Sequence, residues 1–441
     1  MSVTPNVVRS TELGAPASPP LPPFTVTEEA PGIVPAARIP LGIGIVCLVL
    51  IALGLRPAIV SIGPILPDMI NDFALSHTQA SLLTAIPTLL MGLLALPTPW
   101  LSRRFGRDRA IIAALFLLAV ATAGRAVSES TTVLFIATAA VGVGIAIAGA
   151  LAPGFVKESF PSRVAMLMGI YAMALSLGST FAASATGILT DLFGSWRVPA
   201  GAWAIPAILG VIAWLHVERR GTKSLRLKTK ISSAKLPVRN RTAWFVATFF
   251  ALNNVMFYSY ISWIAPVYVD LGHSASSAGV ILACFTLAFM SANPLFGAIS
   301  RNEDRRVYLG LGAAISLTGA IWIAVAPDGF PLVAISLAAF GTGGAFTLSM
   351  TLPLDNAQTD GEATSWNAFV MTVSYLVGAT GPVLVGFLRD LTGSFDMPMW
   401  VLVAVSAAML ATTPLLRPYH HRQTAKDSLI QINFEQHGEP K

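Results

Sequence analysis

Long apolar runs separated by short polar breaks dominate the chain. Each run is close to the roughly 20 residues that a helix needs to cross the hydrocarbon core of a bilayer. The twelve runs lie at about residues 41–66, 79–101, 109–127, 132–156, 163–189, 198–217, 242–266, 276–299, 307–326, 331–353, 365–388 and 397–416. They lack the alternating polarity of membrane β-strands, and lipid-exposed backbone must satisfy its own hydrogen bonds. The pattern predicts an all-α integral membrane protein with twelve transmembrane helices.

Composition and charge agree with a membrane location. Only 11% of the residues are charged and 54% are hydrophobic, whereas about 25% of an ordinary globular protein is charged. With the N-terminus placed in the cytoplasm, the 28 Lys and Arg residues fall in cytoplasmic segments except for Arg56, Arg125, Arg197 and Arg389. This asymmetry follows the positive-inside rule and predicts a multi-pass protein of a bacterial inner membrane with both termini cytoplasmic. Topology therefore accounts for the net charge of +6 without a nucleic-acid partner.

The longest hydrophilic interval within the membrane region divides the runs six and six. We expect a disordered Pro-rich cytoplasmic tail at residues 1–38, a six-helix bundle at 39–217, a basic cytoplasmic linker at 218–241, a second six-helix bundle at 242–417 and a cytoplasmic tail at 418–441.

The two bundles share an internal repeat. The segment GILTDLFGSW, beginning at Gly187, matches GFLRDLTGSF, beginning at Gly386. The same shift along the chain pairs Pro67 with Pro266, Gly142 with Gly341, Gly144 with Gly343 and Arg107 with Arg306. Several agreeing pairs at one register predict two structural repeats of six helices each.

The loop SRRFGRDRA, beginning at Ser102, resembles the loop signature of major facilitator transporters. Arg104, Gly106 and Arg107 fit that signature, whereas Arg103 stands where an aspartate is expected and Asp108 where a basic residue is expected. The resemblance implies the major facilitator fold, in which two six-helix halves rock about a midplane substrate site. It also implies that the three matching residues belong to a cytoplasmic gate.

The stretch LRPAIVSIGPILPD, together with the repeated GxLxDxxGS segment, is similar to the cyanate and 2-nitroimidazole transporter subfamily. That resemblance implies secondary transport, by alternating access, of a small anion or compact polar solute: a cyanate-like, carboxylate or nitroimidazole-like compound.

Arg56 lies deep within the first apolar run. At 1.5 Å per residue it is roughly 22 Å from Leu41, near the middle of a core about 30 Å thick. A charge at that depth costs about 3 kcal/mol or more, so it should face a partner or an aqueous cavity. An internal ion pair or bonds to backbone carbonyls would serve, but no run carries an acidic residue in its middle. Because a guanidinium stays charged and presents a planar donor fork, we predict that Arg56 binds the substrate's charge.

Polar and aromatic residues in other runs are further substrate-binding candidates. The segment NNVMFYSYISW offers Asn253, Asn254, Tyr258 and Trp263, and Tyr171, Thr347 and Asn367 are similar in type. The alternative interpretation is helix packing, interhelical hydrogen bonding and interfacial aromatic anchoring. We expect the glycines at positions 142, 144, 149, 341, 343 and 344 to permit close helix approach.

Other function classes find less support. The chain has no metal-ligand spacing, phosphate-binding loop, paired carboxylates or nucleophile beside a histidine, so we expect no enzyme, catalytic residue, metal or cofactor. A multidrug exporter of the same fold is the main alternative, but one for lipophilic cations should place a carboxylate in its cavity. A non-transporting membrane sensor is a further alternative function. We expect a monomer whose partners are the bilayer and a small-molecule substrate. The histidines lie in loops, tails or at run ends, and no carboxylate lies in the middle of a run, which favours uniport or anion exchange.

Overall fold

The computed structural model describes residues 40–220, 236–300, 304–357 and 360–416. The tails expected at 1–38 and 418–441, and most of the expected linker, lie outside the described residues. Within the described ranges, the regular secondary structure is helical throughout. The prediction of an all-α fold is confirmed.

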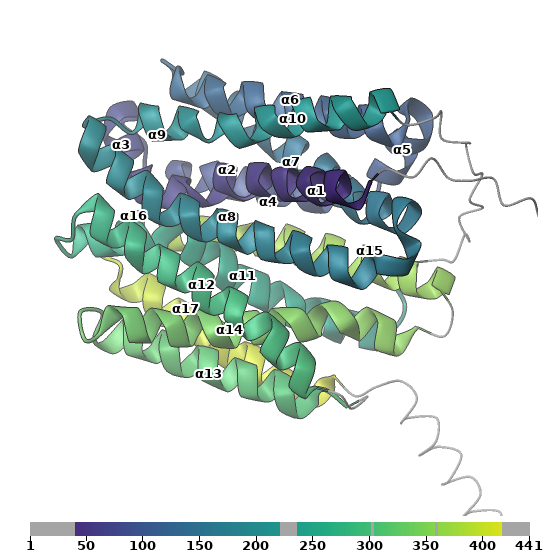
Figure 1. Cartoon of the computed structure of the whole chain (residues 1–441). Helices are drawn as coiled ribbons and strands as arrows, with labels where there is room; N and C mark the ends of the chain where they lie inside the picture. Colours follow the sequence, from purple (N-terminus) through teal and green to yellow (C-terminus); the bar gives the residue numbers. More distant parts are fainter. Residues whose placement is uncertain (1–39, 221–235, 301–303, 358–359, 417–441) are drawn as a thin grey trace, which may run out of the picture. The chain divides into compact units, whose positions relative to one another are not determined.

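Helices of the first half appear in purple to teal in Figure 1. They are α1 (Leu41–Leu55), α2 (Pro57–Val60), α3 (Ile62–Phe73), α4 (His77–Ala95), α5 (Thr98–Phe105), α6 (Arg107–Ala126), α7 (Thr131–Ser159), the short 3-10 helix η1 (Pro161–Arg163), α8 (Val164–Phe193), α9 (Arg197–Ala202) and α10 (Ala204–Arg220). The pieces α1, α2 and α3 together form the first expected transmembrane segment, α4 and α5 the second, and α9 and α10 the sixth.

Helices of the second half appear in green to yellow. They are α11 (Arg241–Asp270), α12 (Ala275–Ile299), α13 (Arg306–Val325), α14 (Pro331–Asn356), α15 (Asp360–Gly378), α16 (Thr380–Thr392), α17 (Asp396–Thr412) and the 3-10 helix η2 (Thr413–Leu415). Because α15 and α16 continue one another, the described helices supply six segments in each half, as the apolar runs predict.

Among the described residues, 11 segments are long and apolar enough to cross a membrane. The expected segment that is not among these 11 is the seventh, α11, which has 30 residues but carries Asn253, Asn254 and several hydroxyl side chains. Those polar groups lower its hydropathy, and nearly the whole middle of α11 is buried among other helices. This helix therefore belongs in the interior of the bundle, away from lipid.

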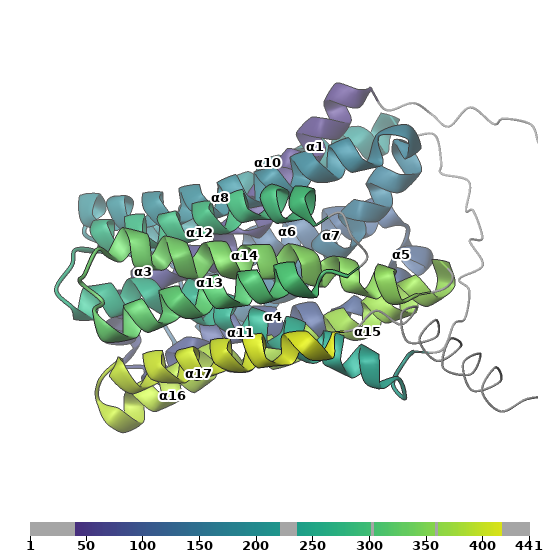
Figure 2. The ribbon, with the colours of Figure 1, turned by 90° about the horizontal axis from the view of Figure 1, so that it is seen from below.

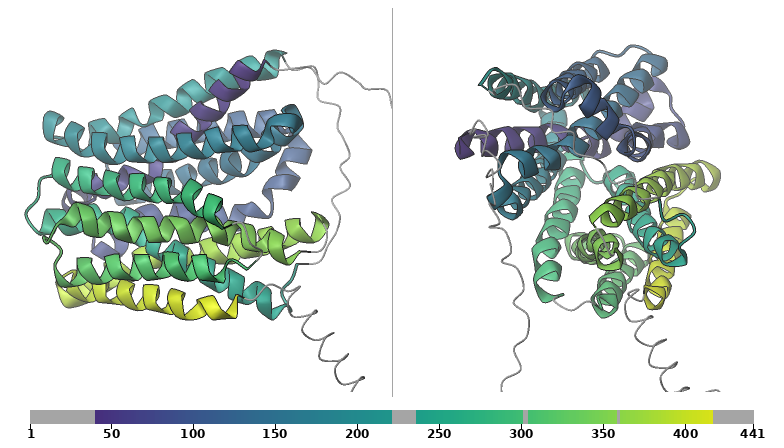
Figure 3. Two further views of the ribbon diagram at one scale, coloured as in Figure 1. Left: turned by 60° about the horizontal axis from the view of Figure 1, so that its bottom comes forward. Right: turned by 90° about the vertical axis from the view of Figure 1, so that its right-hand side faces the viewer.

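Large apolar side chains are exposed on the outer faces of the bundle. Phe116, Ile136 and Ile212 are 61%, 65% and 58% exposed. Patches of this kind are rare on soluble monomers and suit a lipid solvent. Figure 3 shows the helices running roughly alongside one another, as transmembrane segments do.

The two halves meet along a few helix pairs. Helix α8 of the first half packs against α12 of the second, and α4 packs against α15 and α16. The first transmembrane segment contributes α3, which contacts α11 and α12. Figure 2 shows α8 beside α12. We call the end of the bundle farther from Leu41 and Leu416 the distal end; the positive-inside rule predicts that it faces outward.

Glycines allow close helix packing within each half, as predicted. A Cβ at Gly142 would lie 2.7 Å from the Cα of Pro87, and one at Gly144 would lie 2.8 Å from the Ala114 carbonyl oxygen. In the repeat, a Cβ at Gly341 or Gly343 would overlap backbone atoms of α13 or α12. Gly149 differs, because its nearest neighbour would be 3.8 Å away, at ordinary contact distance.

Candidate functional site

Arg56 lies at a break in the first transmembrane segment, between α1 and α2. Pro57, which follows it, has no backbone N–H to donate to the helix ladder. On the other side of the break, Arg125 Nη2 donates to the Ala58 carbonyl oxygen at 2.6 Å. The break is therefore held by a hydrogen bond from a charged donor, a stronger type than one between neutral groups.

Arg125, one of the three arginines that the charge pattern places at non-cytoplasmic helix ends, is buried: it is only 3% exposed. It turns inward from the end of α6 to reach α2 because a carbonyl acceptor is available there. The sequence offers no signal that would distinguish a buried arginine at this position from an exposed one.

Aromatic side chains of the second half face Arg56. Its guanidinium carbon lies 5.8 Å from the centroid of the Phe257 ring, within cation–π range. The phenol group of Tyr258 lies close enough to the guanidinium to interact with it electrostatically. The phenol groups of Tyr171 and Tyr375 lie close enough to interact with it electrostatically. Within the described part of the chain, no ion pair joins Arg56 to a carboxylate.

The aromatic residues around Arg56 also contact one another. The Tyr258 and Tyr375 rings are 6.3 Å apart between centroids, and the Phe257 and Phe289 rings are 4.8 Å apart. The Tyr258 hydroxyl reaches the sulfur of Met91 at 4.0 Å. We call the group formed by Arg56, Tyr171, Phe257, Tyr258 and Tyr375 the arginine–aromatic site. Its members come from both halves, on the α1–α2 break and on α8, α11 and α15.

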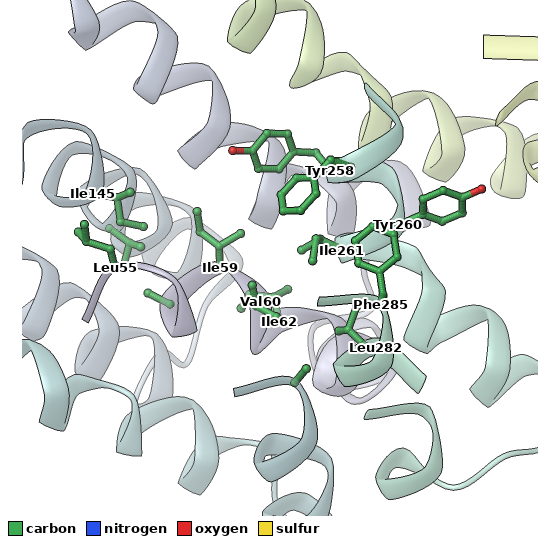
Figure 4. Packing of buried hydrophobic residues seen from close by; sticks show 14 of the residues in the cluster. Leu55, Ile59, Val60, Ile62, Ile145, Tyr258, Tyr260, Ile261, Leu282 and Phe285 are labelled. Carbon is green, nitrogen blue, oxygen red and sulfur yellow. The ribbon is translucent and has the colours of Figure 1, made fainter. Parts of the chain in front are cut away.

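Apolar packing closes this site toward the distal end. Figure 4 shows Val60 and Ile62 of the first segment across the interface from Ile261 and Leu282 of the second half. All four side chains are at most 3% exposed. The approach is close because Gly63 has no side chain: a Cβ there would lie 2.8 Å from the Ile261 carbonyl oxygen.

Sequence reasoning identified Arg56, Tyr171 and Tyr258, which the structure brings together, but it missed Phe257 and Tyr375. Phe257 stands beside Tyr258 in sequence, yet one apolar ring in a membrane helix carries no signal of its own. Tyr375 lies in the eleventh apolar run, where its polar hydroxyl is the signal that could have marked it.

The two predicted asparagines have different surroundings. Asn253 is fully buried and donates to the Thr342 carbonyl oxygen at 2.9 Å, so its amide joins α11 to α14 within the second half. Asn254 is 1% exposed, and neither of its amide atoms has a hydrogen-bond partner among the described residues. It packs against Gly378, where the eleventh segment breaks between α15 and α16.

The remaining predicted substrate residues lie apart from the arginine–aromatic site. The Trp263 indole donates to the Pro382 carbonyl oxygen at 2.9 Å and is fully buried. The Thr347 hydroxyl and the Asn293 side-chain amide form a hydrogen bond of 2.9 Å that links α14 to α12. Asn367 is exposed near the start of α15. None of these three contacts Arg56 in the interactions that the structure describes.

The three residues assigned to the cytoplasmic gate surround the turn between α5 and α6. Gly106 has φ of +91°, a conformation that glycine adopts without steric cost. Arg104 is exposed and stacks near the rings of Trp100 and Phe105. Arg107 contacts Asp108 at 3.2 Å, and its guanidinium carbon lies 5.2 Å from the Phe155 ring centroid. These particular contacts stay within the first half.

The sequence profile of the Major Facilitator Superfamily matches this chain over residues 45–382 and 270–434. The chain belongs to that superfamily. As a major facilitator protein it is a multi-pass membrane transporter, and its repeated six-helix halves are those of the fold.

Two curated relatives extend along most of this transporter. The cyanate transport protein CynX of Escherichia coli (strain K12) is 31% identical over 350 residues, covering 79% of this chain and 91% of that protein. The 2-nitroimidazole transporter of the same organism is 27% identical over 367 residues, covering 82% and 92%. These relatives confirm the subfamily resemblance that the sequence motifs indicated.

A solved structure supports the architecture. The inward-facing crystal structure of a bacterial homolog of the human lysosomal transporter Spinster superimposes with a TM-score of 0.67 at 19% identity. The match covers 85% of this chain and 94% of that one. At this level of identity the likeness concerns the fold.

Proposed function

We propose that this transporter moves a small anion, or a compact solute with a negative pole, and that the arginine–aromatic site binds it. The observation that carries the proposal is a guanidinium at the interface between the halves with no carboxylate ion pair among the described residues. A charge held near the middle of a membrane without a counter-ion costs several kcal/mol. An anionic substrate would supply the missing charge and recover part of that cost.

The chemistry of the site favours a small planar or linear anion. The guanidinium donates in one plane, which matches carboxylate-like groups. The Tyr258 and Tyr375 hydroxyls can add donors, and the Phe257 ring offers an apolar face. Cyanate, carboxylates and nitroimidazoles have this combination of a polar edge and a flat shape. The names of the two curated relatives, one for cyanate and one for 2-nitroimidazole, support the same substrate class.

The proposal includes alternating access in a bacterial inner membrane, with both termini in the cytoplasm. Both halves of the site come from one chain, so a monomer is sufficient. Arg104, Gly106 and Arg107 are assigned to the cytoplasmic gate. In the part of the chain that the structure describes, no carboxylate pairs with Arg56, which favours uniport or anion exchange.

A binding and flux screen of the purified protein tests the proposal. We expect cyanate, nitrate, acetate or 2-nitroimidazole to raise the thermal stability of the protein, because a ligand that binds only the folded state stabilises it. The anion that stabilises most should also enter liposomes containing the protein faster than protein-free liposomes. Stabilisation by lipophilic cations alone, with no response to any anion, would favour the multidrug exporter instead.

Tyr258→Phe isolates the contribution of one phenol hydroxyl. We expect the dissociation constant of the best anion to rise about tenfold, since a net hydrogen bond is worth about 1 kcal/mol and one to a charged group more. Isothermal titration measures the change. The matched control is Tyr260→Phe, because Tyr260 is equally buried on the same helix and its ring packs 5.5 Å from that of Phe285. Equal effects of the two substitutions would remove Tyr258 from the site.

A further inference from the structure

The repeated segment that revealed the two halves has a structural role that the substrate site does not use. In each copy the second glycine, Gly194 or Gly393, ends its helix in the left-handed conformation, with φ of +61° and +74°. That explains one position of the repeat. The aspartate, about one turn earlier, and the first glycine, about two turns earlier, require another explanation.

The aspartate of the second copy caps a helix of the first half. Asp390, on α16, accepts hydrogen bonds from the backbone N–H groups of His77 and Thr78, each at 2.8 Å. It also accepts from the Thr78 hydroxyl at 2.6 Å and lies 2.8 Å from His77 Nδ1. His77 and Thr78 are the first two residues of α4. A carboxylate therefore sits at the positive end of a helix that belongs to the other half.

The aspartate of the first copy makes the reciprocal contact. Asp191, on α8, accepts from the backbone N–H of Ser276 at 3.0 Å. Ser276 is the second residue of α12, in the second half. The shift that takes Asp191 to Asp390 also takes His77 to Ser276. The two contacts are thus related by the internal repeat, and each half caps a helix of its partner half.

The first glycine of each copy lets these helices touch. A Cβ at Gly386 would lie 2.5 Å from the His77 carbonyl oxygen, and one at Gly187 would overlap the Ala275 carbonyl oxygen. The Asp carboxylates can reach the helix starts only because the backbones approach this closely. The two glycines, the two aspartates and the helix starts at His77–Thr78 and Ser276 form what we call the distal latch.

We propose that the distal latch holds the two halves together at the distal end and must open when that end opens. Its bonds are charge-assisted and lie on the axis of a helix dipole, so they are stronger than ordinary surface contacts. The bonds of Asp191 and those of Asp390 all cross between halves that rock against each other in this fold. Replacing the two aspartates by asparagine removes their negative charge and places an amide N–H₂ donor near the backbone N–H donors. Both changes weaken the latch and favour the open distal end.

A distance measurement between spin labels tests the latch without any substrate. With Cys47 and Cys284 replaced by Ser, labels are placed at Val127→Cys in the first half and Val325→Cys in the second. These side chains are 75% and 64% exposed and lie at the distal end. We expect Asp191→Asn combined with Asp390→Asn to raise the ratio of long to short distances about tenfold or more. Asp390→Asn alone should shift it further than Asp191→Asn alone, because Asp390 accepts more hydrogen bonds.

Asp72→Asn is the matched control. Asp72 is a carboxylate at the same end, but it accepts from Arg197 at 2.9 Å and from Trp196 at 3.0 Å, both within the first half. This substitution should leave the distance distribution unchanged. A double variant that is indistinguishable from the Asp72→Asn control would overturn the proposal.

Gly386→Ala provides a second test that keeps both charges. The added methyl group meets backbone at the latch, so it should also increase the long-distance population. Gly169→Ala on α8 is its control, because a Cβ there would meet nothing within 4 Å. The distance measurement does not depend on Arg56. If no anion binds, the distance distributions still test the latch, and if those distributions do not change, the substrate proposal still stands.

Discussion

Arg56→Ala is expected to raise the dissociation constant for the transported anion about a hundredfold or more and to reduce flux into liposomes to the protein-free level. Removing one partner of a buried, hydrogen-bonded charge pair costs about 2–5 kcal/mol, and each 1.4 kcal/mol is about tenfold in affinity. Arg56→Lys should give a dissociation constant and a flux between those of Arg56→Ala and the unsubstituted protein, because lysine keeps the charge but lacks the planar donor fork. Isothermal titration and liposome uptake measure both effects.

Arg109→Ala is the control for a general loss of positive charge. The Arg109 side chain is 78% exposed and pairs with Glu218 at 3.2 Å, far along the chain from the site. Its removal should leave the affinity for the anion unchanged. Near-normal binding by both Arg56 variants would contradict the assignment of Arg56 to the substrate, while leaving the fold and the distal latch unaffected.

Gly341→Ala is expected to lower the stability of the second half by about 1–3 kcal/mol, the usual cost of overpacking a tight interior. A Cβ at this position would overlap the Ser316 nitrogen and the Gly312 carbonyl oxygen of α13. Both are backbone atoms, so the helices must separate to make room. The temperature of unfolding in detergent, followed by intrinsic fluorescence, should fall by several degrees.

Gly154→Ala on α7 is the comparison for helix propensity alone. A Cβ there meets nothing within 4 Å, and alanine in a helix is favoured over glycine by up to about 1 kcal/mol. This variant should unfold at the same temperature as the unsubstituted protein or slightly higher. A rise of similar size in both variants would show that α13 and α14 are not in tight contact at Gly341.

The arginine–aromatic site and the distal latch lie at different levels of one interface. Arg56 stands at the α1–α2 break, whereas the latch bonds lie where α4 and α12 begin. The buried side chains of Val60, Ile62 and Ile261 follow Arg56 and Tyr258 along their segments in the direction of the distal end. A solute at Arg56 in this arrangement is closed off from the distal end both by apolar packing and by the capped helices, so opening that end requires both to be broken.

Much of the site was within reach of sequence reasoning, and the reason is the solvent. Charge is costly in lipid, so Arg56 stands out in an apolar run, as Tyr258 does by its hydroxyl. Asn253 shows the limit of the same argument: it is equally conspicuous, yet its amide bonds to Thr342 inside one half. A polar side chain in a membrane run is expected to have a hydrogen-bonding or charged partner. The sequence does not show whether that partner is another helix or a substrate.

The sequence by itself determined the apolar helices, the division into two repeated halves and the presence of a charge inside the first segment. These follow from the cost of placing polar groups in lipid, which acts on each segment separately. Only the tertiary structure decided which groups from distant segments meet: Phe257 and Tyr375 at Arg56, Arg125 at Ala58, and the repeat aspartates at helix starts of the opposite half. Such contacts depend on how neighbouring helices are rotated and offset, and close glycine packing sets that geometry only when all the helices are assembled.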